Sequence, residues 1–134
     1  MRVAFLNPFF GKDFTKSARW FAKSRGRVQR HPDYLCIAAA TVRAAGHEIM
    51  ICDAQAKNLP LDAVLPRIRA FAPDLMAYQT STPSIDADIA AAARCREITR
   101  ALHVLVGPHV TAEPEDTLRH AQGAVDAIAV GEYD

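Results

Sequence analysis

The sequence is short of cysteine and has no cysteine motif. Its 134 residues include only Cys36, Cys52 and Cys95, and no two of them form a C-x-x-C pair. An odd count without such spacing argues against a disulfide framework and against a zinc or iron–sulfur site built by this chain alone. We therefore expect the chain to depend on its hydrophobic core rather than on cross-links.

Long hydrophobic runs and an excess of charge of one sign are also missing. The apolar run near the N-terminus, Val3–Leu6, is much shorter than a signal peptide or membrane span requires, so we expect a cytoplasmic chain that binds no membrane. A formal net charge of +1 argues against a generally basic nucleic-acid binder and against an acidic disordered chain. We expect one domain, residues 1–134, without a nucleic-acid partner.

The near-neutral charge conceals a basic segment. Residues 11–30 carry seven Lys or Arg and one Asp, a net charge of +6, whereas the rest of the chain carries −5. Phe14, Trp20 and Phe21 lie among these charges. Residues 8–31 therefore stand apart as a basic, aromatic insert, which is long for a connection in an α/β protein.

Five short apolar runs recur along the chain. They are Val3–Leu6, Ile49–Cys52, Leu75–Tyr78, Val104–Val106 and Val125–Val130. Runs this short and unbroken are typical of strands that are buried on both faces. The sequence therefore predicts a strand at each of these positions.

Helical patterns lie between the predicted strands. The first predicted helix ends at Gly46, and the second starts with Asp62 as its N-cap. The third starts with Ser84 as its N-cap, and the fourth spans Pro114–Ala121. The buried face predicted for the third helix consists of Ile85, Ile89, Ala92, Ile98 and Leu102.

This alternation predicts a parallel sheet with helices on both faces. We expect an α/β three-layer sandwich of the Rossmann-like, flavodoxin-like type, with a five-stranded parallel sheet in the order 2-1-3-4-5. The basic insert would follow the first strand. A helix normally covers the last strand of such a sheet, and none is predicted after Val130. We therefore expect a fragment of a longer protein, or a fold that another domain completes.

Ligands of an open α/β sheet bind beyond the carboxyl ends of its strands, near the point where strand order reverses. The first loop there, Asn7–Gly11, contains no G-x-G-x-x-G, no Walker A sequence and no acidic pair. It leads into the insert, for which two interpretations stay open. The insert is either a solvated, partly helical segment that folds against something missing, or an anion- or nucleotide-binding flap. We favour the first because charge runs usually face water.

Two further loops carry polar groups. Thr80–Ser84 offers four hydroxyls, which either contact a polar ligand or serve a helix cap that needs Ser84 alone. Gly107 either lets a ligand approach the backbone or simply makes the turn. His109 has no neighbour at metal-ligand spacing, and no Ser–His–Asp or Cys–His set can be assigned. We therefore expect neither a catalytic residue nor a metal ligand in this chain.

Taken together, these loops resemble the N-terminal cobalamin-binding domain of cobalamin-dependent radical S-adenosylmethionine (SAM) enzymes. The similarity spans essentially the whole chain, in the stretches MRVAFLNPFFGKD, SARWFAKSRGRVQRHPDYL, FAPDLMAYQTSTPSI, VGPHVTAEPEDTL and GEYD. The Gly-Pro-His-Val-Thr stretch, followed by Gly-Glu after the next strand, is its more specific part.

The resemblance implies a domain that holds cobalamin (vitamin B12) at the carboxyl edge of its sheet. It also implies a radical SAM domain in cis, with a C-x-x-x-C-x-x-C motif for a [4Fe–4S] cluster. That motif is absent here, so we expect a non-catalytic chain whose parent is a radical SAM methyltransferase. Other cobalamin domains carry D-x-H-x-x-G after the first strand, whereas Asn7–Gly11 contains no His. We therefore expect base-off cobalamin without a protein His on cobalt.

The cofactor-binding residues implied by the resemblance lie on four loops. They are Asn7, Pro8, Phe9, Gly11, Thr80, Ser81, Thr82, Pro83, Gly107, Pro108, His109, Val110, Gly131 and Glu132. Two other functions stay open: a free-standing flavodoxin-like small-ligand or signalling domain, and an interaction domain that docks an acidic partner through the insert. Saturable cobalamin binding would favour the first function, flavin binding the second, and salt-sensitive partner binding the third.

Overall fold

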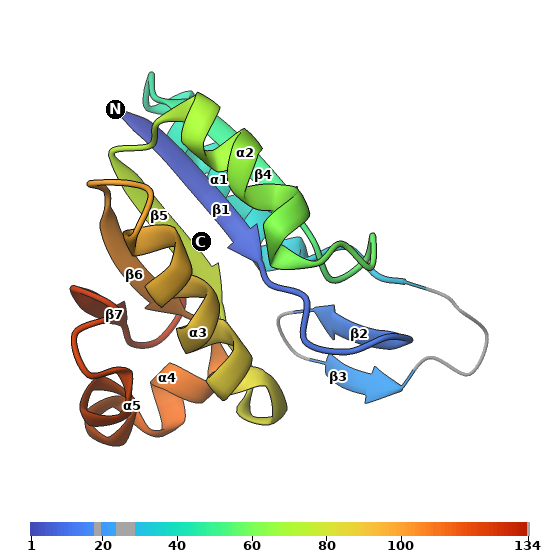
Figure 1. The fold of residues 1–134 in the computed structure, drawn as a ribbon. Coiled ribbons are helices and arrows are strands. Elements are labelled where there is room, and N and C mark those ends of the chain that lie inside the picture. The colour runs from blue at the N-terminus through green and yellow to red at the C-terminus, as the bar shows by residue number, and fades with distance from the viewer. Residues whose placement is uncertain (18–19, 24–28, 134) are drawn as a thin grey trace.

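The structure, a computed structural model, describes residues 1–17, 20–23 and 29–133. Within these residues a five-stranded parallel sheet has the strand order β4-β1-β5-β6-β7, and helices lie on both of its faces (Figure 1). The strands are β1 (Arg2–Asn7), β4 (Glu48–Asp53), β5 (Leu75–Gln79), β6 (Leu102–Val106) and β7 (Ala127–Ala129). This is the predicted 2-1-3-4-5 order, so the predicted fold class is confirmed.

Strand β1 shows why its sequence is continuously apolar. It is hydrogen-bonded to β4 on one side and to β5 on the other. Val3 and Phe5 pack in a core layer on one face of the sheet, whereas Ala4 and Leu6 pack in the layer on the opposite face. Between the exposed Arg2 at its start and Asn7 at its end, a strand that is buried on both faces has no position for a polar side chain.

The helices are divided unequally between the two faces. Those of at least eight residues are α1 (Asp33–Ala44), α2 (Leu61–Phe71), α3 (Ile85–Arg96) and α5 (Pro114–Ala121). Buried side chains of α2, α3 and α5 belong to one core layer, and those of α1 belong to the other. Figure 1 shows α2 and α3 in front of the sheet and α1 behind it.

Two predicted elements are longer than the observed ones. The last strand covers only Ala127–Ala129, and the carboxylate of the preceding Asp126 is bound by the Arg96 guanidinium and the His103 backbone N–H. The third helix ends at Arg96, where backbone hydrogen bonds to Cys95 O close it. The prediction that Leu102 continues this helix is wrong: Leu102 begins β6 and is 55% exposed.

One helix start also differs from the prediction, and one short helix was not predicted. Helix α2 begins at Leu61 with Pro60 at the N-cap, so Asp62 is not the cap. Asp62 lies in the first turn instead, where its carboxylate accepts a hydrogen bond from Arg94 at 2.9 Å. The loop after β6 forms a short helix that was not predicted, α4 (Pro108–Ala112), which also includes His109. A single turn lacks the periodicity that reveals longer helices.

The insert is not a solvated, partly helical segment where the structure describes it. Its described part forms an antiparallel hairpin of β2 (Phe14–Ser17) and β3 (Trp20–Lys23). Figure 1 shows this hairpin beyond the carboxyl end of β1. Lys16, the central charge of β2, is 1% exposed. The charge run therefore misled the prediction, because one of its lysines belongs to the interior.

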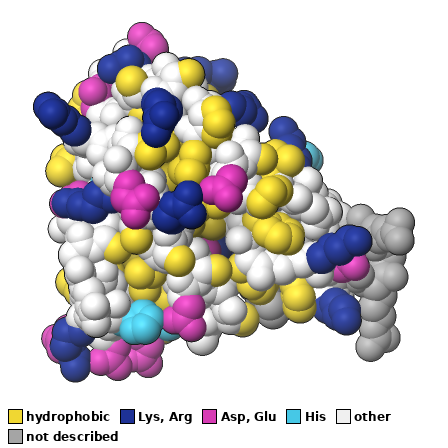
Figure 2. Space-filling view, in the orientation of Figure 1, with side chains coloured by type: hydrophobic (Ala, Val, Ile, Leu, Met, Phe, Trp, Pro, Cys, Tyr) yellow, Lys and Arg dark blue, Asp and Glu magenta, His cyan; other side chains and the backbone are white. Residues whose placement is uncertain are grey.

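The surface over α2 and α3 has no field of a single sign. Figure 2 shows apolar side chains along the seam between these helices, with basic and acidic side chains mixed around them. Among the described residues, no helix combines the length and the apolar composition that crossing a membrane requires.

Candidate functional site

The carboxyl edge of the sheet brings the predicted site residues together. Because all five strands are parallel, the loops after β1, β5, β6 and β7 emerge at this one edge. Strand order reverses between β1 and β5, since the chain passes from β1 outward to β4 and then returns to β5. Asn7 is the last residue of β1, and every other predicted site residue lies on one of these four loops or in the first turn of the helix that follows.

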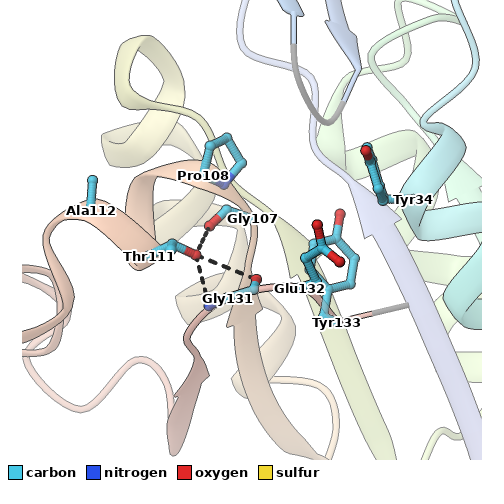
Figure 3. A pocket seen from close by; sticks show the side chains of 8 residues that line it. All are labelled: Tyr34, Gly107, Pro108, Thr111, Ala112, Gly131, Glu132 and Tyr133. Carbon is cyan, nitrogen blue, oxygen red and sulfur yellow. Dashed lines mark hydrogen bonds between the residues drawn. The ribbon is translucent and has the colours of Figure 1, made fainter.

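A pocket of about 320 Å³ opens at this edge. Figure 3 shows Tyr34 of α1 and Tyr133 on one side of the pocket, and Pro108 and Ala112 of α4 on the other. The remaining lining residues are Gly107, Thr111, Gly131 and Glu132. Most of the lining is apolar, which suits the flat, apolar part of a small molecule. Of the predicted site residues, Gly107, Pro108, Gly131 and Glu132 line the pocket.

Thr111 fixes the wall of this pocket. Its hydroxyl donates to Gly107 O at 2.9 Å and accepts from Gly131 N at 3.1 Å, as Figure 3 shows. The loops after β6 and β7 are thereby joined through one side chain. Thr111 was not among the predicted site residues, although its position four residues after Gly107, one helical turn on, is the spacing at which a hydroxyl reaches back to a carbonyl.

Gly107 is required by the packing of two loops. Its φ is +114°, and a Cβ there would lie 2.8 Å from Thr80 O. Thr80 is fully buried, and its backbone N–H and its hydroxyl both donate to Val106 O at 2.8 Å. Gly107 therefore lets the loops after β5 and β6 approach closely, and Thr80 holds them together rather than facing the pocket.

The hydroxyls after β5 are mostly used inside the protein. Ser81 Oγ and Ser84 Oγ lie 2.7 Å apart, and both side chains are buried. Thr82 is exposed, with its Oγ1 3.1 Å from Nδ1 of the half-buried His109. Pro83 is exposed beside it. Of residues 80–84, the hydroxyl of Thr82 is thus the one best placed to meet a ligand.

The loop after β1 is fastened by side-chain amides. Asn7 Nδ2 donates to Asp53 Oδ1 at 2.9 Å and to Lys16 O at 3.1 Å. Gln55 Nε2 donates to the carbonyls of Gly11 and Phe14, both at 2.8 Å, so the loop rests on the chain that follows β4. Gln55 was not predicted, because its partners lie more than 40 residues away in the sequence.

Other predicted site residues lie beneath the loops of the carboxyl edge and pack against the interior. Pro8 is buried, and Phe9 packs against the core layer under α2 and α3. Val110 is fully buried in the same layer. These side chains hold the loops from the inside, whereas Pro108, Gly131 and Glu132 are exposed.

A buried ion pair lies beneath the loop after β5. Lys16 Nζ of β2 is 2.5 Å from Asp88 Oδ1 in the first turn of α3, and neither side chain is exposed. Ser84 Oγ donates to the other oxygen, Asp88 Oδ2, at 2.7 Å. Burial lowers the pKa of Lys16 and raises the pKa of Asp88, and the attraction between the two charges opposes both changes. Neither Lys16 nor Asp88 was among the predicted site residues.

One buried polar group beside the pocket has no partner. Among the described residues, the amide nitrogen Gln79 Nε2 at the end of β5 has no acceptor within hydrogen-bond reach and is shielded from solvent. The Gln79 Oε1 lies 3.5 Å from the hydroxyl oxygen of Tyr133, a residue that lines the pocket. A buried donor without an acceptor is unusual in a folded protein. Its place next to the pocket suits a polar ligand group.

Within residues 1–17, 20–23 and 29–133, no three His, Cys, Asp or Glu side chains converge as metal ligands do.

Comparison with known proteins places this edge in a family context. The family model for the B12 binding domain matches residues 28–134. The matched segment holds β4, β5, β6 and β7 with helices α1 to α5, and therefore the residues that line the pocket. No curated protein and no solved structure shows significant similarity to the chain.

Proposed function

Because this chain belongs to the B12-binding domain family and binds cobalamin, we propose that it holds the cofactor at the carboxyl edge of its sheet. We also propose that it is the cofactor module of a radical SAM methyltransferase. The observation that carries the placement is the apolar pocket at that edge, between α1 and α4. The family match also favours cobalamin over the flavin or the acidic partner of the other two hypotheses.

The residues around the pocket fit the nucleotide tail of cobalamin. Tyr34, Pro108 and Tyr133 offer apolar and aromatic surface for the dimethylbenzimidazole base. Gly107 and Gly131 leave the backbone open to the tail. The unpartnered Gln79 Nε2 is a donor for a ribose or phosphate oxygen. Together these groups supply apolar contact along the base and polar contact along the linker.

We propose that cobalamin is bound here without a protein His on cobalt. The loop after β1, residues 7–11, contains no His. The imidazole of His109 in the loop after β6 lies 3.1 Å from Thr82 Oγ1, a local partner. The tail would then occupy the pocket in the base-off state.

The parent enzyme is inferred from the resemblance of the loops to cobalamin-dependent radical SAM proteins. Its [4Fe–4S] cluster and SAM would belong to a radical SAM domain in cis, because this chain has no C-x-x-x-C-x-x-C motif. In such an enzyme cobalamin would supply the methyl group for transfer to an unactivated carbon. This chain would hold and orient the cofactor, and Tyr34 and Tyr133 would keep water from its tail.

Titration of the 134-residue chain with hydroxocobalamin tests the proposal. We expect a saturable change of the visible spectrum, with no signature of imidazole on cobalt. A spectrum of His-ligated cobalt would contradict the base-off assignment, and the absence of saturable binding would contradict the cofactor. The encoding reading frame tests the parent enzyme, since a frame without C-x-x-x-C-x-x-C would overturn the radical SAM assignment.

A further inference from the structure

The β2–β3 hairpin is tied to the carboxyl edge by a charge pair that is fully removed from water. Lys16 of β2 and Asp88 of α3 are 72 residues apart in sequence, and both side chains are 0% exposed. Burying two charges costs free energy. Their mutual attraction offsets this cost only when the geometry is good and the other polar atoms of both groups also have hydrogen-bond partners. Surface pairs elsewhere, such as Arg119 with Asp116, are 73% and 68% exposed and contribute little.

The immediate surroundings of the pair meet that condition. Asp88 uses both carboxylate oxygens, one for Lys16 Nζ and the other for the Ser84 hydroxyl. Ser84 in turn contacts Ser81 at the end of the loop after β5. The Lys16 ammonium lies 6.0 Å from the centre of the Phe10 ring, within the range of cation–π attraction. The pair therefore links the hairpin, α3 and two site loops.

Two neutral contacts fasten the same strand. Asn7 Nδ2 binds Lys16 O, and Gln55 Nε2 binds Phe14 O. Strand β2 is thus held by α3, by the end of β1 and by the chain after β4. All three attachment points lie at the carboxyl edge, near the reversal of strand order between β1 and β5. A solvated excursion would need none of these attachments.

We propose that the Lys16–Asp88 pair makes the hairpin a fixed wall of the cobalamin site, so that both residues act as positioning residues for the cofactor. This inference rests on the proposed function. Such a wall would limit the access of solvent to the corrin from the side of β2. Loss of the pair would free β2 from α3 and open that side of the site to solvent.

The test compares three variants with the wild-type chain. Lys16→Met leaves Asp88 buried without its cation, and Gln55→Ala loosens the same strand without leaving a charge unpaired. Asp126→Asn is the matched control, because it breaks an ion pair with Arg96 at the opposite, amino edge of the sheet. Circular dichroism establishes that each variant is folded. Cobalamin affinity and tryptic cleavage within residues 11–30 are then measured for all four proteins.

We expect Lys16→Met to bind hydroxocobalamin at least about tenfold more weakly than the wild type. Gln55→Ala should show a smaller loss, and Asp126→Asn none. Both hairpin variants should be cleaved faster within residues 11–30. If Lys16→Met does not fold, Gln55→Ala decides the question alone.

A readout at saturating cofactor separates a wall from a purely stabilising contact. Excess cyanide converts cobalamin to its dicyano form only when both faces of the corrin are accessible. Both hairpin variants should undergo this conversion severalfold faster than the wild type, and Asp126→Asn should match the wild type. If variants that are cleaved faster show unchanged cobalamin affinity and unchanged cyanide kinetics, the proposal that the hairpin is a wall of the site is wrong. Failure of the wild type to bind cobalamin would instead overturn the proposed function.

Discussion

Gly107 is the residue at which two loops of the cofactor site come closest. Its backbone combines a φ of +114° with a ψ of −171°, a conformation that is essentially restricted to glycine. The Thr80 carbonyl fills the space that a Cβ would occupy. The same residue therefore serves the fold and lines the pocket, and comparison with Gly131 separates the effect of its backbone conformation from that of the contact with Thr80.

We expect Gly107→Ala to lower the free energy of unfolding by about 2 kcal/mol or more, from backbone strain and the contact with Thr80 O. Gly131→Ala is the matched control. Gly131 also has a positive φ, +93°, but no atom lies within 4 Å of its Cβ position, so the loss should be about 1 kcal/mol. Urea unfolding monitored by circular dichroism measures both. Equal losses in the two variants would show that the contact with Thr80 is relieved at little cost.

Single residues differ in how far the sequence reveals them. Gly107 could be predicted, because a glycine directly after a buried strand indicates a turn or a close approach. Lys16 could not, because its burial depends on Asp88, and nothing local distinguishes it from the exposed lysines around it. Thr80 was expected to face a ligand, but its hydroxyl is bound to Val106 O. The surroundings of Lys16 and Thr80 are set by residues that are distant in the sequence.

At the scale of elements, Asp126 joins α3, β6 and the start of β7. Its two carboxylate oxygens accept hydrogen bonds from Arg96 of α3 at 2.7 and 2.8 Å. One of them also accepts from the backbone N–H of His103 in β6. The Arg96 hydrogen bonds, and then that of His103, hold the pKa of Asp126 well below its usual range. Stability of this corner should therefore depend on pH.

The direction of this pH dependence follows from the lowered pKa of Asp126. Asp126 is ionised more readily in the folded chain, so its contribution is fully present above the unfolded pKa of about 3.9 and is lost as pH falls toward the folded value. We expect Asp126→Asn to have a lower urea midpoint than the wild type between pH 5 and 7, and this difference to shrink below about pH 4. Urea titrations across this pH range measure it.

Asp116→Asn is the control for that measurement. Asp116 pairs with Arg119 on the surface of α5, where both side chains are about 70% exposed, so its removal should leave the midpoint nearly unchanged at every pH. A gap for Asp126→Asn that is as large at pH 2.5 as at pH 6 would show that the effect is not the ionised pair.

Elements were predictable in proportion to their length and pattern. The strands of the main sheet are unbroken apolar runs and the longer helices show helical periodicity, so their positions could be predicted from the sequence. The helix α5 was predicted with its observed bounds, Pro114–Ala121. The short helix α4 and the β2–β3 hairpin were not, because one has a single turn and the other is held by distant side chains.

On the scale of the whole molecule, the two edges of the sheet differ in the groups that they present. The carboxyl edge holds the pocket, the buried Lys16–Asp88 pair and the unpartnered Gln79 amide. At the amino edge, the turns that lead into β4 and β6 are held by backbone hydrogen bonds, such as Glu48 N to Met1 O and Leu102 N to Asp74 O. A ligand at the carboxyl edge should therefore protect one half of the molecule more than the other.

Hydrogen exchange with and without hydroxocobalamin measures this difference in protection between the two edges of the sheet. We expect slower exchange of loop amides in residues 80–84, 107–111 and 131–133 when the cofactor is bound, because the ligand suppresses their local opening. Amides of the turns at 46–48 and 99–101 open independently of the site, so they should change little. Equal protection at both edges would contradict binding at the carboxyl edge.

Cobinamide, which lacks the nucleotide tail, separates the contributions of the corrin and of the tail to this protection. If the tail occupies the pocket lined by Tyr34, Gly107 and Tyr133, cobinamide should leave the amides of residues 131–133 exchanging as they do in the free chain. Protection near the β2–β3 hairpin, residues 14–17, should remain, since the hairpin would face the corrin. If cobinamide protects residues 131–133 as strongly as cobalamin does, the tail does not occupy the pocket. The pocket would then be a contact for the corrin or its side chains.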